Sequence, residues 1–377
     1  MQNQGWRRHQ TSIGIGIFAA VVILLGWIEI ARPMGLTFSD LTGGVVTFDT
    51  MVRVGILTTV VVGLNLLMGH AGQISLGQAG FYAIGAYVSA IMTTRAANRG
   101  INVFFPGLIP DQWWWWPWLM ILAGMVITGV VAYLIGKPVL RLRGHYLAMG
   151  TLGVGLIIFI LFREGSTFTG AFDGIASVPR LSIGGFEIWP RERYYFLVWA
   201  VALAVMWLSL NIVNSRVGRA LRAIEGSELA AHTMGVDIEK FKLQVFVLST
   251  VFASIAGSLY AHYQTLVNPA PFGFVGSLDL VIMAALGGLA SIWGAPFGVG
   301  IVYVIKEVLR ARLHQLLHGA GGEHEIIFFG ILLVVIMIFM PQGLSYGVTR
   351  AYGRLRGGWA ARRGGGREVE PPTEQVA

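Results

Sequence analysis

The sequence has no cysteine among its 377 residues, and only 12% of its residues are charged. Without cysteine, disulfide bonds, thiolate zinc sites and a cysteine nucleophile are all excluded. The scarcity of charge argues against a soluble fold, because soluble domains carry about 25% charged residues. Hydrophobic residues make up 55% of the chain, and its 51 glycines are typical of helices that pack closely in lipid.

The net charge of +8 does not indicate a nucleic-acid partner, because the basic residues flank apolar runs instead of gathering on one soluble face. The segment Gly322–Glu325 contains one histidine between two glutamates but lacks the second histidine of a zinc protease motif. We therefore expect neither a catalytic site nor a metal site.

Long stretches without Asp, Glu, Lys or Arg dominate the chain, and a helix needs about 20 mostly apolar residues to cross the hydrocarbon core. These stretches are 11–28, 54–94, 112–136, 144–162, 194–215, 243–278, 280–305 and 326–349. The second is long enough for two spans, about 53–69 and about 73–94. The pattern predicts an all-α, multi-pass membrane protein of about eight to ten membrane helices.

The basic residues predict the orientation, because Lys and Arg concentrate in cytoplasmic loops. Placing the N-terminus inside puts 16 of the 27 Lys and Arg residues in the cytoplasm and eight outside, which leaves three undecided within 306–312. We expect a cytoplasmic N-terminus (1–11), a transmembrane domain (12–349) and a basic, disordered cytoplasmic tail (350–377). This distribution predicts residence in the inner membrane.

The stretch 279–305 cannot be a single plain span, because that would place the arginine-rich tail outside. It is interrupted at Gly287 and Gly288 and again at Gly294 and Pro296. We predict a broken segment here, either a re-entrant hairpin or two short spans. Irregular backbone at membrane depth is tolerated only inside protein or beside a water-filled cavity, so Gly287 and Gly288 are translocation-path candidates. Asp279 is expected to cap a helix start, with a role in ion coupling as the alternative.

A glycine-rich segment between the second and third spans carries five uncharged polar residues. These are Asn65, His70, Gln73, Ser75 and Gln78. Polar side chains at this depth face the bundle or a cavity, so we predict that they line the translocation path. Hydrogen bonding between helices is the alternative for each of them.

The loop 214–242 has helical spacing of apolar residues over 217–234, and Gly235 is placed as a C-terminal cap. Such an amphipathic helix between two spans can lie on the membrane, connect the spans, or dock into a partner. Its mixed charge argues against the membrane surface.

The pattern Glu228-x-Ala230-Ala231-x-x-x-Gly235 resembles the EAA loop of ABC importer permeases. Together with blocks at 66–85, 143–153 and 285–294 in the same order, it resembles the branched-chain amino acid ABC transporter permeases of the LivM type over about 12–345. The chain departs from that pattern at His145 and across Thr169–Gly174, where solute choice is expected to be affected.

The resemblance implies a machine of several subunits: a second, LivH-like permease, two cytoplasmic ATPases and a periplasmic or lipid-anchored solute-binding protein. This chain lacks the pattern G-x-x-x-x-G-K-[ST], so ATP is expected on the partner subunits, and we expect no cofactor here. The resemblance places ATPase coupling on one set of residues. They are Arg219, Glu225, Glu228, Ala230, Ala231 and Gly235.

The expected function is uptake of branched-chain or related hydrophobic amino acids. An alternative keeps the same machinery for urea, short amides or another small organic solute. A stand-alone channel or secondary transporter is the alternative of a different class. It would need no coupling helix and would show a buried carboxylate for ion coupling.

Overall fold

The computed structural model describes residues 2–31, 46–94, 114–184, 186–189, 191–316 and 330. The longer helices are α1 (Gln2–Ala31), α3 (Phe48–Leu64), α4 (Gln78–Thr93), α6 (Trp116–Val139), α7 (His145–Glu164), α9 (Arg191–Val213), α10 (Arg216–Gly226), α12 (Ile238–Gln264), α13 (Phe274–Gly287) and α14 (Gly294–Leu316). Shorter helical turns are η2 (Asn65–His70), α8 (Ser166–Thr169), η3 (Ala171–Asp173), α11 (Glu228–Thr233) and η4 (Ala270–Phe272). Four strands complete the described part: β1 (Ile175–Ala176), β2 (Ser182–Ile183), β3 (Phe186–Glu187) and β4 (Leu266–Val267).

Among the described residues, five helices are long and apolar enough to cross a membrane. They are α3 continued by η2, α6, α7, α9 and α12. Two shorter apolar helices add to these. One is the part Gly14–Ile30 of α1, and the other is α13. The prediction of an all-α, multi-pass membrane protein is therefore confirmed. The stretch 326–349, apart from residue 330, lies outside the described residues, as do Gly322–Glu325 and the tail 350–377.

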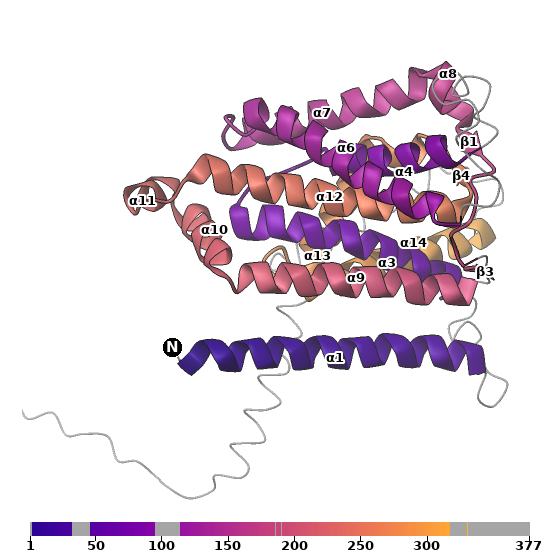
Figure 1. Ribbon diagram of the computed structural model, residues 1–377, viewed down its shortest axis with the longest axis horizontal. Helices are drawn as coiled ribbons and strands as arrows, with labels where there is room; N and C mark the ends of the chain where they lie inside the picture. The colour runs from indigo at the N-terminus through magenta and orange to yellow at the C-terminus, as the bar shows by residue number, and fades with distance from the viewer. Residues whose placement is uncertain are drawn as a thin grey trace, which may run out of the picture.

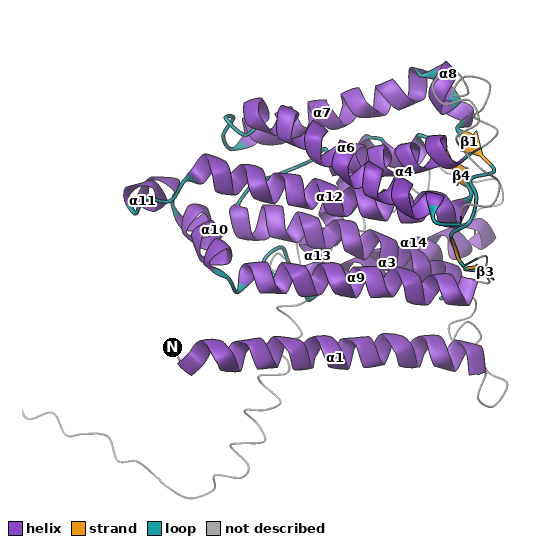
Figure 2. Ribbon diagram, in the orientation of Figure 1, coloured by secondary structure: helices purple, strands orange, loops and turns teal. Residues whose placement is uncertain are grey.

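The long helices run side by side, and the irregular elements collect at the two ends (Figure 1). The helices α10 and α11 project from the end where α1 begins, whereas α8 and the strands lie at the opposite end. Figure 2 shows that strand structure is confined to that opposite end. There β1 pairs antiparallel with β4 and β2 pairs antiparallel with β3, so two short ribbons close this face of the bundle.

Helices α3, α4 and α12 form the centre of the bundle, and small residues build their contacts. A Cβ atom on Gly85 of α4 would overlap the carbonyl oxygen of Ser254 in α12, and one on Gly257 would overlap that of Tyr82. The Ser258 hydroxyl donates to the Gly85 carbonyl oxygen at 3.0 Å. Such close approach of backbones is what associates helices in lipid, where apolar contact alone gives no driving force.

Helices α13 and α14 form an antiparallel hairpin, which confirms the predicted break in 279–305. A Cβ atom on Gly294 would overlap the carbonyl oxygen of Gly287 at the reversal. Further along, Lys306 Nζ lies 2.5 Å from Asp279 Oδ2. The two arms are unequal in length, because α13 has 14 residues whereas α14 has 23 and extends past Lys306.

The prediction that Asp279 caps a helix is wrong. Gly273 is the N-cap of α13, and Asp279 lies in the second turn, where its carboxylate pairs with a lysine of the neighbouring helix. A carboxylate inside a membrane helix is costly unless it is paired, and the antiparallel arrangement of the hairpin supplies that partner.

Cysteine labelling is expected to separate the two ends of the molecule. The helix α9 has 23 residues, about 35 Å of helix, and it lies between the strands and α10. A labelling position must be exposed. Ile175 at the strand end is only 6% exposed and is unsuitable, whereas Ala176 beside it and Ala223 in α10 are both exposed.

We expect Ala223→Cys to react with a membrane-impermeant maleimide only from the cytoplasm, and Ala176→Cys only from outside. The chain has no native cysteine, so the unmodified protein is the background control. The reverse pattern of labelling would invert the orientation that the basic residues predict.

Candidate functional site

The loop predicted to couple to an ATPase contains two helices, α10 and α11, and not the single helix expected over 217–234. Ser227 breaks the helix because its backbone is extended, with φ −164° and ψ 115°. Its hydroxyl oxygen accepts a hydrogen bond from the Ala230 N–H at 3.3 Å and so caps α11. Gly226, a weak helix former, precedes the break.

The helix α10 is amphipathic and packs one face on the bundle. Leu221 and Ile224 are buried, while Arg219 and Glu225 are exposed. The start of α10 lies tight against the end of α9, because a Cβ atom on Gly218 would overlap backbone carbonyl oxygens there. The apolar stripe predicted for this loop therefore holds along α10.

The helix α11 turns a different set of side chains outward. Ala231 is buried against the bundle, whereas Ala230 is exposed. Leu229 is 77% exposed, and Met234, the last residue of the predicted apolar spacing over 217–234, is 83% exposed. Exposed apolar side chains at the tip of a projecting element are typical of a surface that a partner covers.

Glu228 forms an ion pair within this chain. Its Oε1 atom accepts a hydrogen bond from Lys242 Nζ at 2.6 Å, and the Lys242 side chain is only 9% exposed. The pair fastens α11 to the first turns of α12. Glu225 is exposed and forms no ion pair with another described residue.

Gly235 ends α11 in the left-handed conformation, with φ +77°, as its predicted role as a C-terminal cap requires. The N–H of Gly235 donates to the His232 carbonyl oxygen at 3.0 Å, and that of Val236 donates to the Ala231 carbonyl oxygen at 3.1 Å. These two hydrogen bonds form a Schellman motif, which fixes the direction in which the chain enters α12.

The five polar path candidates are all buried in the structure, and three of them make hydrogen bonds. Asn65 Nδ2 donates to the Ser291 carbonyl oxygen at 2.9 Å. Gln78 Nε2 donates to the carbonyl and hydroxyl oxygens of Ser249, each at 2.9 Å. His70 Nδ1 lies 3.2 Å from the Asn65 carbonyl oxygen. Asn65 and Gln78 thus hold separate parts of the bundle together.

Gln73 and Ser75 differ from the other three. Neither the amide atoms of Gln73 nor the hydroxyl of Ser75 has a hydrogen-bond partner within the described part of the chain. A buried polar atom left unpaired costs about 1–3 kcal/mol, so such groups point to a bound molecule or water. Both residues lie in the non-helical segment 72–77, where the pattern had predicted the third span to begin.

The broken region lies directly against this polar segment. A Cβ atom on Gly69 in η2 would overlap the carbonyl oxygen of Leu289, which follows Gly287 and Gly288 in the reversal. Gly288 has φ +96°, a conformation that favours glycine. The structure thus brings together the two sets of path candidates that the sequence places more than 200 residues apart.

The helix α10, part of the loop predicted to couple to an ATPase, also reaches this segment. A Cβ atom on Gly72 would lie 3.7 Å from Cγ of Glu225, so α10 packs against the chain just before Gln73. Gly72 itself has φ +64°, which lets the chain turn sharply there.

A charged network at the opposite end was not predicted. Arg53 Nε lies 2.7 Å from Asp49 Oδ2, and its Nη2 donates to Gln264 Oε1 at 3.0 Å. The Tyr263 hydroxyl donates to the other oxygen of Asp49 at 2.7 Å. The spacing of Asp49 and Arg53, four residues apart on a helix, could have indicated the ion pair, but only the fold shows that α12 completes it.

Comparison with known proteins agrees with this architecture. The family profile described as "Branched-chain amino acid transport system / permease component" matches residues 46–341. The permease protein LivM of a high-affinity branched-chain amino acid transport system from Salmonella typhimurium is 33% identical over 84% of this chain and 73% of its own length. LivM of Escherichia coli K12 is 33% identical over 79% of this chain and 69% of its own length.

A second type of permease is more distantly similar. LivH of Escherichia coli K12 is 24% identical over 76% of this chain and 89% of its own length. No solved structure matches the chain. The match over 46–341, together with the LivM similarity, shows that this chain belongs to the family of permease components of branched-chain amino acid ABC transport systems.

Proposed function

We propose that this chain forms one half of the membrane pathway of an ATP-driven importer for branched-chain amino acids. Membership of the family implies paired permease and ATPase partners. In this proposal the second permease is LivH-like, two ATPases bind on the cytoplasmic side, and a solute-binding protein delivers the amino acid from outside.

One observation carries the proposal: a Cβ atom on Gly72 would lie 3.7 Å from Cγ of Glu225, so α10 lies close to the segment that carries the buried side chains of Gln73 and Ser75. An ATPase that binds the exposed Leu229 and Met234 would displace α11 and also α10, because only Ser227 separates the two helices. The pair of Glu228 with Lys242 would pass the displacement on to α12. That motion reaches the polar segment directly through Gly72. Rigid-body displacement of packed helices is the usual form of such coupling.

The unpaired polar atoms of Gln73 and Ser75 are the proposed solute contacts. An amide and a hydroxyl can hydrogen-bond the ammonium and carboxylate groups of an amino acid without adding a charge to the pathway. The close approach of Gly69 to Leu289 and of Gly287 to Gly294 provides the tight packing that keeps this path narrow.

The test is uptake by proteoliposomes that contain the complete complex with ATP on the side of the ATPases. We expect ATP-dependent accumulation of radiolabelled leucine. Excess isoleucine or valine should reduce this accumulation, and excess urea or acetamide should not. Competition by urea or acetamide, with no leucine uptake, would reassign the cargo. Leucine uptake by this chain in the absence of the ATPases would instead indicate a channel or a secondary transporter.

A further inference from the structure

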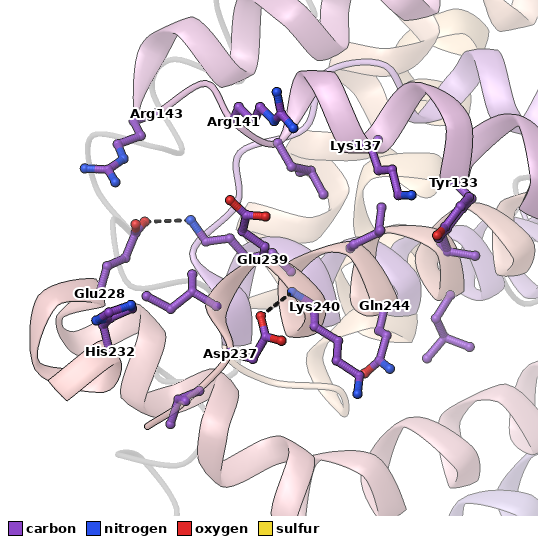
Figure 3. Close-up of a pocket in the computed structure, with 18 of the residues that line it drawn as sticks. Tyr133, Lys137, Arg141, Arg143, Glu228, His232, Asp237, Glu239, Lys240 and Gln244 are labelled. Atoms are coloured by element: carbon purple, nitrogen blue, oxygen red, sulfur yellow. Dashed lines mark hydrogen bonds and ion pairs between the residues drawn. The ribbon is translucent and has the colours of Figure 1, made fainter. Parts of the chain in front are cut away.

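A groove of about 1470 Å³ lies on the surface between α6, the connection from α6 to α7, α11 and α12 (Figure 3). It opens at the end of the bundle that carries the coupling loop. One part of its wall is charged and the other is apolar, and the two parts lie at different depths along the same helices.

The charged part contains five cations and three carboxylates, a net charge of +2. Lys137, Arg141 and Arg143 follow one another along one rim of the groove (Figure 3). All three are exposed, and none forms an ion pair with a described carboxylate. Lys242 is already paired with Glu228. Three cations along this rim are therefore available to an anion.

The apolar part runs down the membrane-spanning region of α12. Leu243, Val247 and Val251 line the groove four residues apart, so they form one stripe on the helix. Tyr133 of α6 faces them one turn before Lys137, and the Lys137 ammonium lies 4.5 Å from its ring. From Lys240 to Val251 the wall extends about 16 Å along the helix. Both α6 and α12 are long, apolar spans, so this wall lies at hydrocarbon depth.

We propose that the groove binds an anionic phospholipid of the adjoining leaflet. The phosphate contacts Lys137, Arg141 and Arg143, and one acyl chain lies along the stripe on α12. Basic pockets between membrane helices suit anionic headgroups, and charge-assisted hydrogen bonds to phosphate are among the strongest that side chains make. A soluble partner cannot follow the apolar wall into the hydrocarbon, whereas an acyl chain fills it by virtue of its length.

The lipid would also contact the coupling element, because Glu228, His232 and Gly235 line the same groove. An anionic headgroup there lies beside the pair that holds α11 to α12.

Lipid retention by the purified complex tests this proposal. The complex is placed in nanodiscs of phosphatidylcholine that contain a small share of deuterated phosphatidylglycerol, extracted with mild detergent and analysed by native mass spectrometry. We expect Lys137→Gln combined with Arg141→Gln and Arg143→Gln to lower retained phosphatidylglycerol about tenfold or more, since each basic residue near the membrane surface contributes to anionic lipid binding.

The matched control removes three arginines from the opposite end, by Arg163→Gln, Arg191→Gln and Arg193→Gln, and it should retain the lipid. Val247→Trp fills the groove while keeping every cation, so it should also reduce retention; it provides a second measurement if the triple variant folds poorly. Equal retention by the wild type, the triple variant and Val247→Trp would overturn the proposal.

Two competitors distinguish the possible sources of the anion. Excess long-chain phosphatidylglycerol should displace the deuterated lipid, and inorganic phosphate should not. Displacement by inorganic phosphate would mean a free-anion site and would refute a lipid site. The proposal would also be refuted if the triple variant lost ATPase binding while keeping its lipid, because the cations would then belong to a protein interface.

Discussion

Glu228→Arg is expected to abolish ATP-driven uptake while leaving membrane insertion intact. Glu228 Oε1 lies 2.6 Å from Lys242 Nζ, so the substitution places two cations together beside a lysine that is 9% exposed. Leaving a buried charge without its partner costs about 1–3 kcal/mol or more. A six-residue helix has little stability of its own, so α11 depends on this contact. The measurements are leucine uptake, ATP hydrolysis and the amount of chain in the membrane.

A charge swap separates the two roles open to Glu228. If Glu228 acts by pairing with Lys242, Glu228→Lys combined with Lys242→Glu should restore uptake. If it pairs with a basic residue of an ATPase, the swap should remain as inactive as Glu228→Arg. Glu187→Arg, a reversal of an exposed charge at the opposite end, serves as the control and should transport normally.

The backbone at Gly235 tests the same element without changing a charge. Gly235 has φ +77°, and proline requires about −65°, so Gly235→Pro cannot keep the Schellman turn and should uncouple hydrolysis from uptake. Asparagine tolerates the left-handed region, and no atom lies within 4 Å of a Cβ built at this position, so Gly235→Asn should keep most of the uptake. Equal uptake by the two variants would contradict a role for the turn.

Gly69→Ala is expected to destabilise the whole bundle. Its added methyl group would overlap the carbonyl oxygen of Leu289, which cannot move freely because Asn65 holds the neighbouring Ser291 carbonyl oxygen at 2.9 Å. Overpacking of this kind costs about 1–3 kcal/mol, and here it separates the hairpin of α13 and α14 from η2. We expect a lower midpoint of thermal unfolding in detergent and a loss of leucine uptake.

Gly153→Ala is the matched control, because it makes the same substitution in α7, where no atom lies within 4 Å of the added carbon. Alanine is favoured over glycine inside a helix by about 0.5–1 kcal/mol, so this variant should be as stable as the wild type or slightly more stable. If the two variants unfold at the same temperature, the contact between Gly69 and Leu289 does not matter for stability.

The helices were predictable from the sequence because hydropathy is a property of consecutive residues. The break in 279–305 was predictable for a related reason, since Gly287, Gly288, Gly294 and Pro296 are visible as local signals. The break at Ser227 also has local causes, but the apolar spacing on both sides of it favours one continuous helix. In the structure, the cap on α11 outweighs that spacing.

The candidate sites were less predictable, since their roles depend on partners far away in the chain. Glu228 was expected to face an ATPase, and its partner in the fold is Lys242. The sequence is equally consistent with Asn65 and Gln78 as solute ligands or as contacts between helices. In the fold, each of them has a hydrogen-bond partner in another part of the chain. Gln73 and Ser75 have no partner among the described residues, a distinction that no pattern in the sequence indicates.

The sequence by itself determined that this protein crosses the membrane many times, carries no nucleotide-binding loop of its own and belongs among the branched-chain amino acid permeases. Composition, runs of apolar residues and short motifs carry that information locally. Only the tertiary structure decided which polar groups are paired and that α10 lies close to the segment that carries Gln73 and Ser75. It also decided that the basic rim of Lys137, Arg141 and Arg143 and the apolar stripe on α12 line the same groove. Those features arise where helices meet, as when Asn65 bonds to a residue 226 positions further along the chain.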